Sequence, residues 1–155
     1  MMEFISKLLL SFILLGFISL SFLIGLYLGI ATNNIYSRDA PSNYLNRSDI
    51  IIYSDKVCLN ISNASVSNYA DSGSMKNTLD ENSNGIWIEI TSPNDVHIGD
   101  IVSYSKGNDT IIHRVIGIEN KSNETFFKLK GDNNNFPDPI VNYSQLKEKT
   151  IILVY

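Results

Sequence analysis

The fold is decided by residues 111–118, Ile111-Ile112-His113-Arg114-Val115-Ile116-Gly117-Ile118. β-Branched residues fill most of this run, and they favour extended backbone because their side chains restrict rotation about χ1. Four shorter runs of similar composition are each bounded by Asn, Gly, Pro or Asp, namely Ile86–Ile90, Asp100–Tyr104, Phe126–Leu129 and Ile151–Val154. No window of about 12 residues after Asp71 keeps a helical period of 3.6. This part of the chain is therefore predicted to be mainly β, as one compact antiparallel β domain.

An uncharged apolar segment, Leu8–Ala31, precedes that domain. As a helix it would extend about 36 Å at ~1.5 Å per residue, enough to cross a hydrocarbon core of ~30 Å. The competing interpretation is a cleaved secretory signal, whose apolar part is typically only ~7 to 15 residues long. The greater length favours a retained amino-terminal transmembrane α-helix.

The sequence thus predicts three parts: a membrane anchor at 1–32, a polar spacer at 33–70 and a β-rich domain at 71–155. Within the spacer, residues 50–53 and 57–59 are apolar enough for short strands. Basic residues flank the anchor on both sides, so the positive-inside rule does not decide its orientation. Acceptor sequons for N-glycosylation, all on the carboxyl side of the anchor, are compatible with an extracytoplasmic domain; they begin at Asn46, Asn60, Asn63, Asn108, Asn120, Asn123 and Asn142.

Charge and cysteine content argue against several functional classes. The net charge of -4 comes without a basic stripe, which disfavours nucleic-acid binding. Cys58 is the only cysteine, so the chain forms no intrachain disulfide and offers no cysteine cluster for zinc. His97 and His113 are the only histidines, and neither lies in a cluster at metal-ligand spacing. We therefore expect no metal and no cofactor.

Three short boxes carry chemically useful residues, although each alone has an ordinary structural explanation. Ser72-Gly73-Ser74-Met75 is typical of an exposed turn. His113 lies on a predicted strand, where a histidine is more often structural than catalytic. Lys130-Gly131-Asp132 begins a polar loop that reaches a second carboxylate at Asp138, and such a loop by itself is at most a weak calcium site.

In this order and spacing, the boxes resemble signal peptidase I of the archaeal and endoplasmic-reticulum type, the serine, histidine, aspartate branch of that family. The resemblance covers the amino-terminal anchor and about Asp71 to Asp138, and it is densest at Gly99-Asp100-Ile101-Val102-Ser103-Tyr104 and the two boxes that follow. One departure is Lys76-Asn77 after Ser-Met, where the family usually has a proline-containing pair.

The resemblance implies a serine endopeptidase with Ser74 as nucleophile and His113 as general base. A serine hydroxyl needs a base to take its proton, and an imidazole with an ordinary pKa of ~6.5 suits that role. Family precedent gives the orienting carboxylate to Asp138, with Asp132 as a nearby support, although the sequence alone does not separate these roles. By similarity, the backbone N–H of Ser74 and the hydroxyl of Ser72 would form the oxyanion hole.

The same resemblance implies the substrates and the compartment. Substrates would be signal-peptide-bearing preproteins with small residues before the cut, and the expected partners are the lipid bilayer and the protein-export translocon. The enzyme would be a single-pass protein of the cell membrane, or of the endoplasmic-reticulum membrane in a eukaryote, with its catalytic domain on the extracytoplasmic side.

Two other functions compete with the peptidase. The first is a catalytically degenerate, membrane-anchored relative that serves as an accessory or binding subunit. Retention of the serine, the histidine and both acids argues against it. The second is an unrelated anchored surface protein whose Asn-rich domain binds a partner, with the boxes present by chance.

Overall fold

The computed structural model describes residues 15–17, 19–21, 23 and 39–155. The chain divides into two units, Met1–Ser37 and Arg38–Tyr155, and the strands all belong to the second. Most of the predicted anchor at 1–32 lies outside the described residues. Within the described ranges, none of the helices combines the length and the apolar character that a membrane crossing requires.

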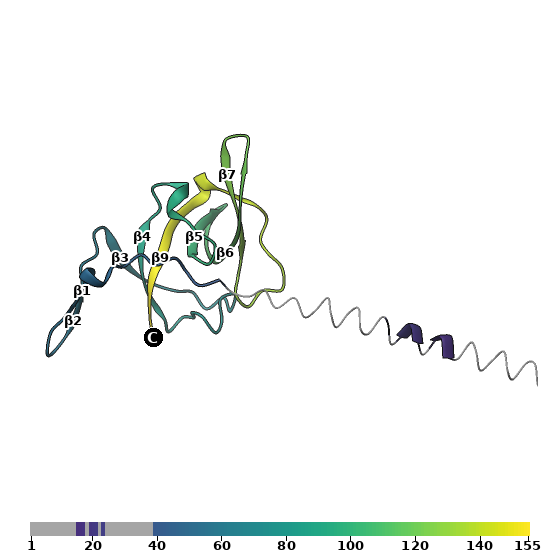
Figure 1. Cartoon of the computed structure of the whole chain (residues 1–155), viewed down its shortest axis with the longest axis horizontal. Helices are drawn as coiled ribbons and strands as arrows, with labels where there is room; N and C mark the ends of the chain where they lie inside the picture. Colours follow the sequence, from purple (N-terminus) through teal and green to yellow (C-terminus); the bar gives the residue numbers. More distant parts are fainter. Residues whose placement is uncertain (1–14, 18, 22, 24–38) are drawn as a thin grey trace, which may run out of the picture. The chain divides into compact units, whose positions relative to one another are not determined.

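The second unit is built on a seven-stranded antiparallel sheet with the order β3-β4-β9-β5-β6-β7-β8, drawn in Figure 1. Its strands are β3 (Ala64–Asn68), β4 (Asn84–Glu89), β5 (Ile101–Lys106), β6 (Asp109–Lys121), β7 (Glu124–Lys130), β8 (Val141–Asn142) and β9 (Leu146–Val154). Short 3-10 helices lie at η1 (Arg47–Asp49), η2 (Pro93–Asp95) and η3 (Tyr143–Gln145). The prediction of a mainly β, antiparallel domain is confirmed.

Tight turns fix the register at the centre of this sheet. Lys106 pairs with Asp109 across a two-residue turn in which Gly107 has a φ of 63°. The turn between β6 and β7 places Ser122 and Asn123 at φ values of 51° and 67°. Two-residue hairpin turns with positive φ match the twist of antiparallel strands. β6 is thereby set in register with β5 and with β7.

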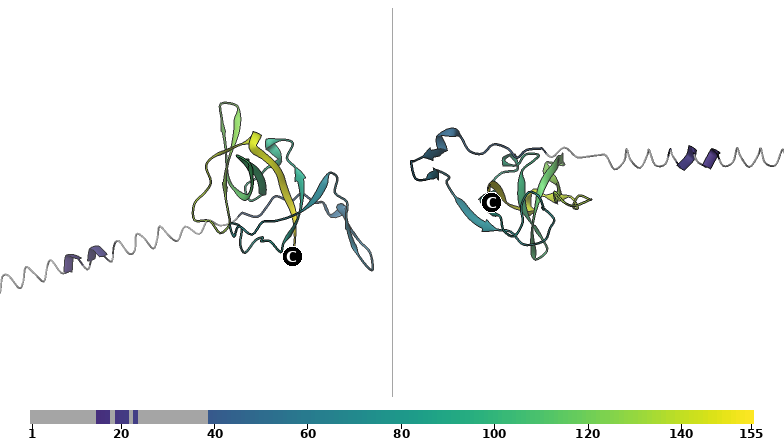
Figure 2. Two further views of the ribbon diagram at one scale, coloured as in Figure 1. Left: turned by 180° about the vertical axis from the view of Figure 1, so that it is seen from behind. Right: turned by 90° about the horizontal axis from the view of Figure 1, so that it is seen from below.

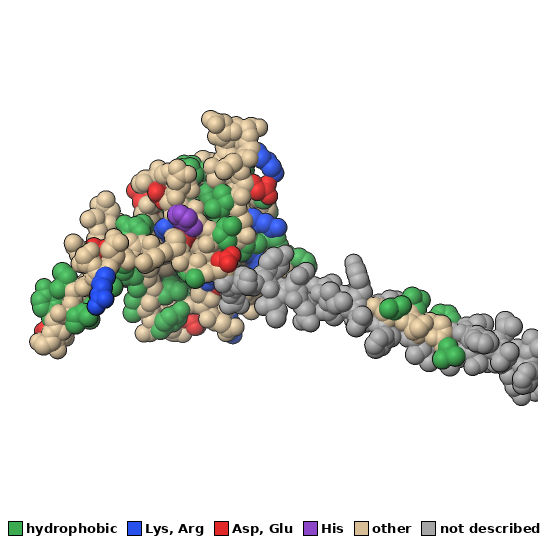
Figure 3. Space-filling view, viewed as in Figure 1, with side chains coloured by type: hydrophobic (Ala, Val, Ile, Leu, Met, Phe, Trp, Pro, Cys, Tyr) green, Lys and Arg blue, Asp and Glu red, His purple; other side chains and the backbone are tan. Residues whose placement is uncertain are grey.

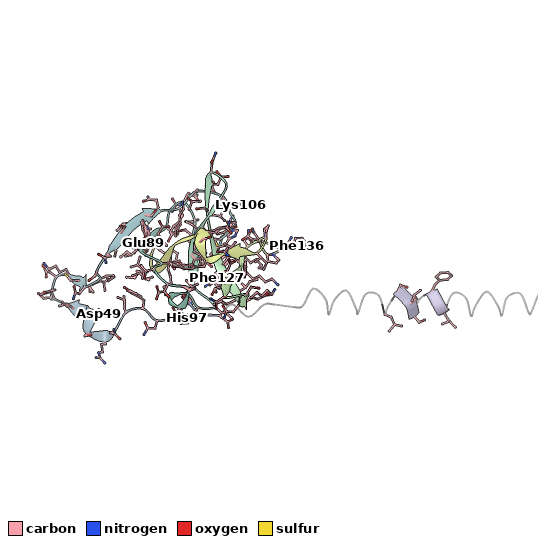
Figure 4. The ribbon with its side chains drawn as sticks, turned by 90° about the horizontal axis from the view of Figure 1, so that it is seen from above. Asp49, Glu89, His97, Lys106, Phe127 and Phe136 are labelled. Atoms are coloured by element: carbon pink, nitrogen blue, oxygen red, sulfur yellow. The ribbon has the colours of Figure 1, made fainter. Side chains whose placement is uncertain are left out.

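Two hydrophobic clusters form the core. The larger contains buried residues from several strands, namely Ile90, Val96, Val102, Tyr104, Val115, Phe127, Leu129, Val141 and Leu146. The smaller consists of Tyr69, Met75, Leu79 and Ile101. Figure 4 shows Phe127 inside the domain and Phe136 at its periphery, in agreement with their exposed fractions of 0% and 80%. Met75 of the smaller cluster directly follows Ser74, so its burial fixes the position of the serine box.

All five predicted apolar runs overlap strands of the main sheet, whereas the strand β3 was not predicted. β3 has the sequence Ala-Ser-Val-Ser-Asn, and its Val66 is 70% exposed. It pairs on one side only, with β4, and forms an edge of the sheet. Edge strands bury little apolar surface, so their sequences lack the composition that identifies a central strand.

A separate hairpin, β1 (Ile50–Ile52) with β2 (Val57–Leu59), occupies the two segments that had been considered for short strands. It projects away from the main sheet in both views of Figure 2. Hydrophobic side chains are visible over this projection in the space-filling view of Figure 3. Ile52 and Val57 are the most exposed of them, at 77% and 61%.

A buried ion pair ties the segment before this hairpin to the sheet. Lys149 Nζ lies 3.3 Å from Asp100 Oδ2 and donates to the carbonyl of Asp95 at 2.6 Å. The other carboxylate oxygen of Asp100 accepts from the backbone N–H and the hydroxyl of Ser42, at 2.7 and 2.8 Å. A Cβ at Gly99 would lie 2.2 Å from the carbonyl oxygen of Ala40. Residues 40–42 are thus packed against the turn that precedes β5 and against Lys149 of β9.

We expect Lys149→Met to destabilise the domain by about 3 kcal/mol or more, because it leaves the buried carboxylate of Asp100 without its cation. Lys147→Met is the matched control, since Lys147 lies on the same strand but is exposed. Urea unfolding of the full-length proteins, followed by tryptophan fluorescence, measures the difference. Equal unfolding midpoints for the two variants would contradict a stabilising role for the pair.

Candidate active site

The serine box lies in a turn between β3 and β4. Gly73 has a φ of 67°, a conformation that glycine adopts without steric cost. The hydroxyls of Ser72 and Ser74 lie 3.1 Å apart, and the backbone N–H of Ser74 donates to Ser72 Oγ at 3.4 Å. Ser72 is exposed, whereas Ser74 is half-buried. The box thus presents two interacting hydroxyls at the surface.

The residues after the serine box fold into a turn in which position 77 excludes proline. The N–H groups of Thr78 and Leu79 donate to the carbonyl of Met75 at 3.0 and 3.1 Å. Asn77 has a φ of 73°, which asparagine tolerates but which a proline ring forbids. Asn77 therefore has a backbone conformation that a proline at this position would not adopt, held by hydrogen bonds of the turn.

The loop after β7 contacts the serine box directly. The N–H of Asn133 donates to the carbonyl of Ser74 at 2.9 Å, and its side-chain amide donates to the carbonyl of Gly73 at 3.0 Å. A Cβ at Gly131 would lie only 2.6 Å from the carbonyl oxygen of Ser74, so glycine permits this approach. Two segments about 60 residues apart in the sequence are joined here by their backbones.

His113 makes a direct contact with one of the two candidate aspartates. It is 4% exposed on the central strand β6, and its Nδ1 pairs with Oδ2 of Asp138. Asp138 is held in place by its own backbone, whose N–H donates to the carbonyl of Leu129 at 2.8 Å. A carboxylate that accepts from Nδ1 fixes the orientation and the tautomer of the ring. Nε2 is then the ring nitrogen that this carboxylate does not engage.

Asp132 contacts a different set of residues. Its two oxygens accept from Nε and Nη2 of Arg114 at 2.8 and 2.7 Å, in a bidentate pair that is almost fully buried. Nη1 of the same arginine donates to the carbonyl of Gly99 at 2.7 Å. The hydroxyl of Thr78 also donates to Asp132. Asp132 thus joins β6, the turn after the serine box and the loop after β7.

A cleft of about 350 Å³ brings the reactive groups together. Ser72, Ser74, His113 and Asp138 all line it. Much of the remaining wall is apolar, with Tyr69, Met75, Leu79, Ile111 and Ile112, and Lys106, Thr110 and Asn134 add polar groups. The cleft therefore offers a hydroxyl, an imidazole and a carboxylate beside a surface suited to small apolar groups.

Of the five residues singled out from the sequence, Asp132 does not line this cleft, while the other four do. The sequence had left open which aspartate meets the histidine, and the geometry separates the two: Asp138 contacts His113, and Asp132 contacts Arg114. Among the described residues, no group of three or more His, Cys, Asp or Glu side chains could hold a metal ion.

Sequence reasoning missed Tyr104 as part of this site. Its ring centroid lies 6.5 Å from that of His113, and the residue is 2% exposed. Strand alternation shows only that Val102 and Tyr104 share a face, and the register of β5 against β6 is what brings Tyr104 beside His113.

Comparison with known proteins adds no family assignment. No family model matches the chain, and neither a curated protein nor a solved structure matches it. The geometry of the cleft and the sequence resemblance are therefore the two grounds for a function.

Proposed function

We propose that the chain is a signal peptidase I, a membrane-anchored serine endopeptidase that removes amino-terminal signal peptides from preproteins at the extracytoplasmic face of the membrane. The observation that carries the proposal is the pairing of His113 Nδ1 with Asp138 in the cleft that Ser74 also lines. The uncharged Leu8–Ala31 segment supports the anchor.

The proposed reaction is acyl transfer through Ser74. Nε2 of His113 takes the hydroxyl proton as Ser74 Oγ attacks the scissile carbonyl, and the imidazolium then gives that proton to the leaving amine. Asp138 stabilises the imidazolium without itself taking the proton. Water, activated by the same imidazole, releases the signal peptide from the acyl-enzyme and restores Ser74.

Charge that develops on the carbonyl oxygen needs donors already directed at it. The backbone N–H of Ser74 and the hydroxyl of Ser72 are the proposed donors. In the absence of substrate these two groups contact each other at 3.4 Å, so substrate would replace that long hydrogen bond. The side-chain amide of Asn133 donates to the carbonyl of Gly73 at 3.0 Å and so holds the peptide unit that carries the first donor.

Substrate would bind as an extended strand. Main-chain hydrogen bonds to an exposed sheet edge give affinity, while pockets for alternate side chains give selectivity. The open edge strand β3 leads directly through Tyr69 to the serine box, and Tyr69 also lines the cleft. The modest volume of the cleft suits small residues before the cut.

The deciding experiment is cleavage of a model preprotein by the full-length chain in membranes, with the new amino terminus located by mass spectrometry. The expected product begins just after small residues at the first and third positions before the cut. A folded, membrane-bound protein that cleaves none of a panel of preproteins would instead favour the degenerate accessory subunit.

The rate should depend on pH in the manner of a histidine base. Protonated imidazole accepts no proton, so we expect kcat/KM to fall about tenfold per pH unit on the acid side of the pH profile. Initial rates between pH 4 and pH 9 measure this, and circular dichroism at each pH checks that the fold persists. A flat acid limb would rule out His113 as the base.

A further inference from the structure

Tyr104 carries the one unsatisfied buried side-chain polar atom among the described residues. Its hydroxyl has no hydrogen-bond partner, although the residue is 2% exposed. An unsatisfied buried polar group costs folding free energy, so such a group calls for an explanation. Core packing alone does not supply one, because a phenylalanine would fill the same space without the cost.

The position of Tyr104 follows from the sheet register. Val102 on β5 pairs with His113 on β6, and Tyr104 lies two residues further along β5. Residues at this spacing share a face, so Tyr104 is the diagonal neighbour of His113. The two rings are tilted by 50° with their centroids 6.5 Å apart.

The charged group that affects the hydroxyl of Tyr104 is the carboxylate of Asp138. Burial, and then the negative charge of Asp138, raise the pKa of Tyr104 to about 12. The hydroxyl therefore stays protonated throughout the physiological range and offers a proton to the carboxylate. It does not complete a hydrogen bond of ordinary geometry, since its oxygen is without a partner within bonding limits.

The carboxylate of Asp138 has room for that donor. Its Oδ2 is engaged by His113, and a carboxylate accepts more than one hydrogen bond. The hydroxyl of Tyr104 and the carboxylate of Asp138 are close enough to interact, because a weak hydrogen bond between them also contributes to the raised pKa of Tyr104. His113 becomes positively charged during acyl transfer, and this change is what would bring the hydroxyl of Tyr104 and the carboxylate of Asp138 into a hydrogen bond.

We propose that Tyr104 is a positioning residue that donates a hydrogen bond to Asp138 in the course of the reaction and thereby holds the carboxylate against His113. This inference rests on the proposed function. Through Asp138, the hydroxyl acts on the imidazole without touching substrate.

The proposal predicts both a rate and a direction of pH shift. A donor on Asp138 draws negative charge away from His113, so its removal in Tyr104→Phe strengthens the hold of the imidazole on its proton. The acid limb of kcat/KM should move to higher pH by about half a unit or more, and kcat should fall about tenfold at an unchanged KM. The other charged groups around the histidine are Lys106 at the end of β5 and the Arg114–Asp132 pair, and neither changes in this variant.

Tyr143→Phe is the matched control, because Tyr143 packs against the same core cluster, whereas the ring that lies beside His113 is that of Tyr104. Thermal unfolding shows that each variant folds. A second variant with 3-fluorotyrosine at 104 strengthens the donor and should move the acid limb the opposite way. Unchanged kcat and an unchanged limb in both Tyr104 variants would overturn the proposal and leave the tyrosine as packing.

A readout that needs no cleavage separates this inference from the proposed function. In full-length protein carrying Ser74→Ala, the titration midpoint of the His113 ring is followed by NMR, with and without Tyr104→Phe. A higher midpoint in the double variant supports the coupling even if no preprotein is ever cleaved. Normal cleavage by the protein that carries Tyr104→Phe alone, together with identical His113 midpoints in the two Ser74→Ala proteins, would refute the role of Tyr104. The peptidase assignment would still stand.

Discussion

Replacing Ser74 with alanine is expected to abolish preprotein cleavage, with a loss in kcat on the order of 10⁶. The hydroxyl of Ser74 is the only group in the proposed mechanism that forms a bond to the substrate. Without that hydroxyl, His113 has no proton to accept from a nucleophile, so His113 and Asp138 contribute little to the rate. Initial rates of preprotein processing in membranes measure the effect.

Two controls make the Ser74 result specific. Ser105→Ala removes a half-buried hydroxyl on β5 that does not line the cleft, and it should leave the rate unchanged. Ser72→Ala removes one proposed oxyanion donor and should cost about 10²- to 10³-fold. Cleavage at the normal rate by the Ser74 variant would end the assignment of Ser74 as nucleophile.

Asp138→Asn is expected to lower kcat by about 10⁴, the size of loss seen when the orienting carboxylate of a serine protease triad becomes an amide. An amide no longer stabilises the imidazolium and favours the wrong tautomer of His113. Because asparagine has nearly the same shape and Asp138 is anchored through its backbone to Leu129, the fold should persist.

Asp132→Asn should behave differently, although the two aspartates are only six positions apart. It leaves the buried Arg114 without its bidentate partner, which typically costs about 3 to 5 kcal/mol of stability. We therefore expect a large drop in unfolding midpoint for Asp132→Asn and a large drop in kcat at near-normal stability for Asp138→Asn. The reverse pattern would exchange the roles given to the two residues.

Composition predicted the central strands well because they are buried on both sides. In β5 the first four residues are all buried, and their β-branched and aromatic side chains mark the strand without any knowledge of its neighbours. β3 and the turn at Asn77 were not predictable in this way. One is an edge strand with a polar sequence, and the other depends on hydrogen bonds to Met75.

The candidate site likewise has residues that composition predicts and residues that only the fold brings into place. The serine box, the histidine and the pair of aspartates stand out by residue type and order. Tyr104 carries no such mark, since an aromatic residue in a β run is the ordinary sign of a core position. Its place beside His113 and Asp138 depends on the pairing of β5 with β6 and on the path of the loop after β7.

The amino-acid sequence by itself determined that this protein has an antiparallel β domain and which side chains are candidates for its chemistry, because local propensity and residue identity are properties of short segments. Only the tertiary structure decided that His113 meets Asp138, that Asp132 meets Arg114, and that Asp100 and Lys149 hold the spacer against the sheet. The reason is physical: each of these pairings joins segments that are separate in sequence, and a carboxylate selects its partner by the distance and burial that folding imposes.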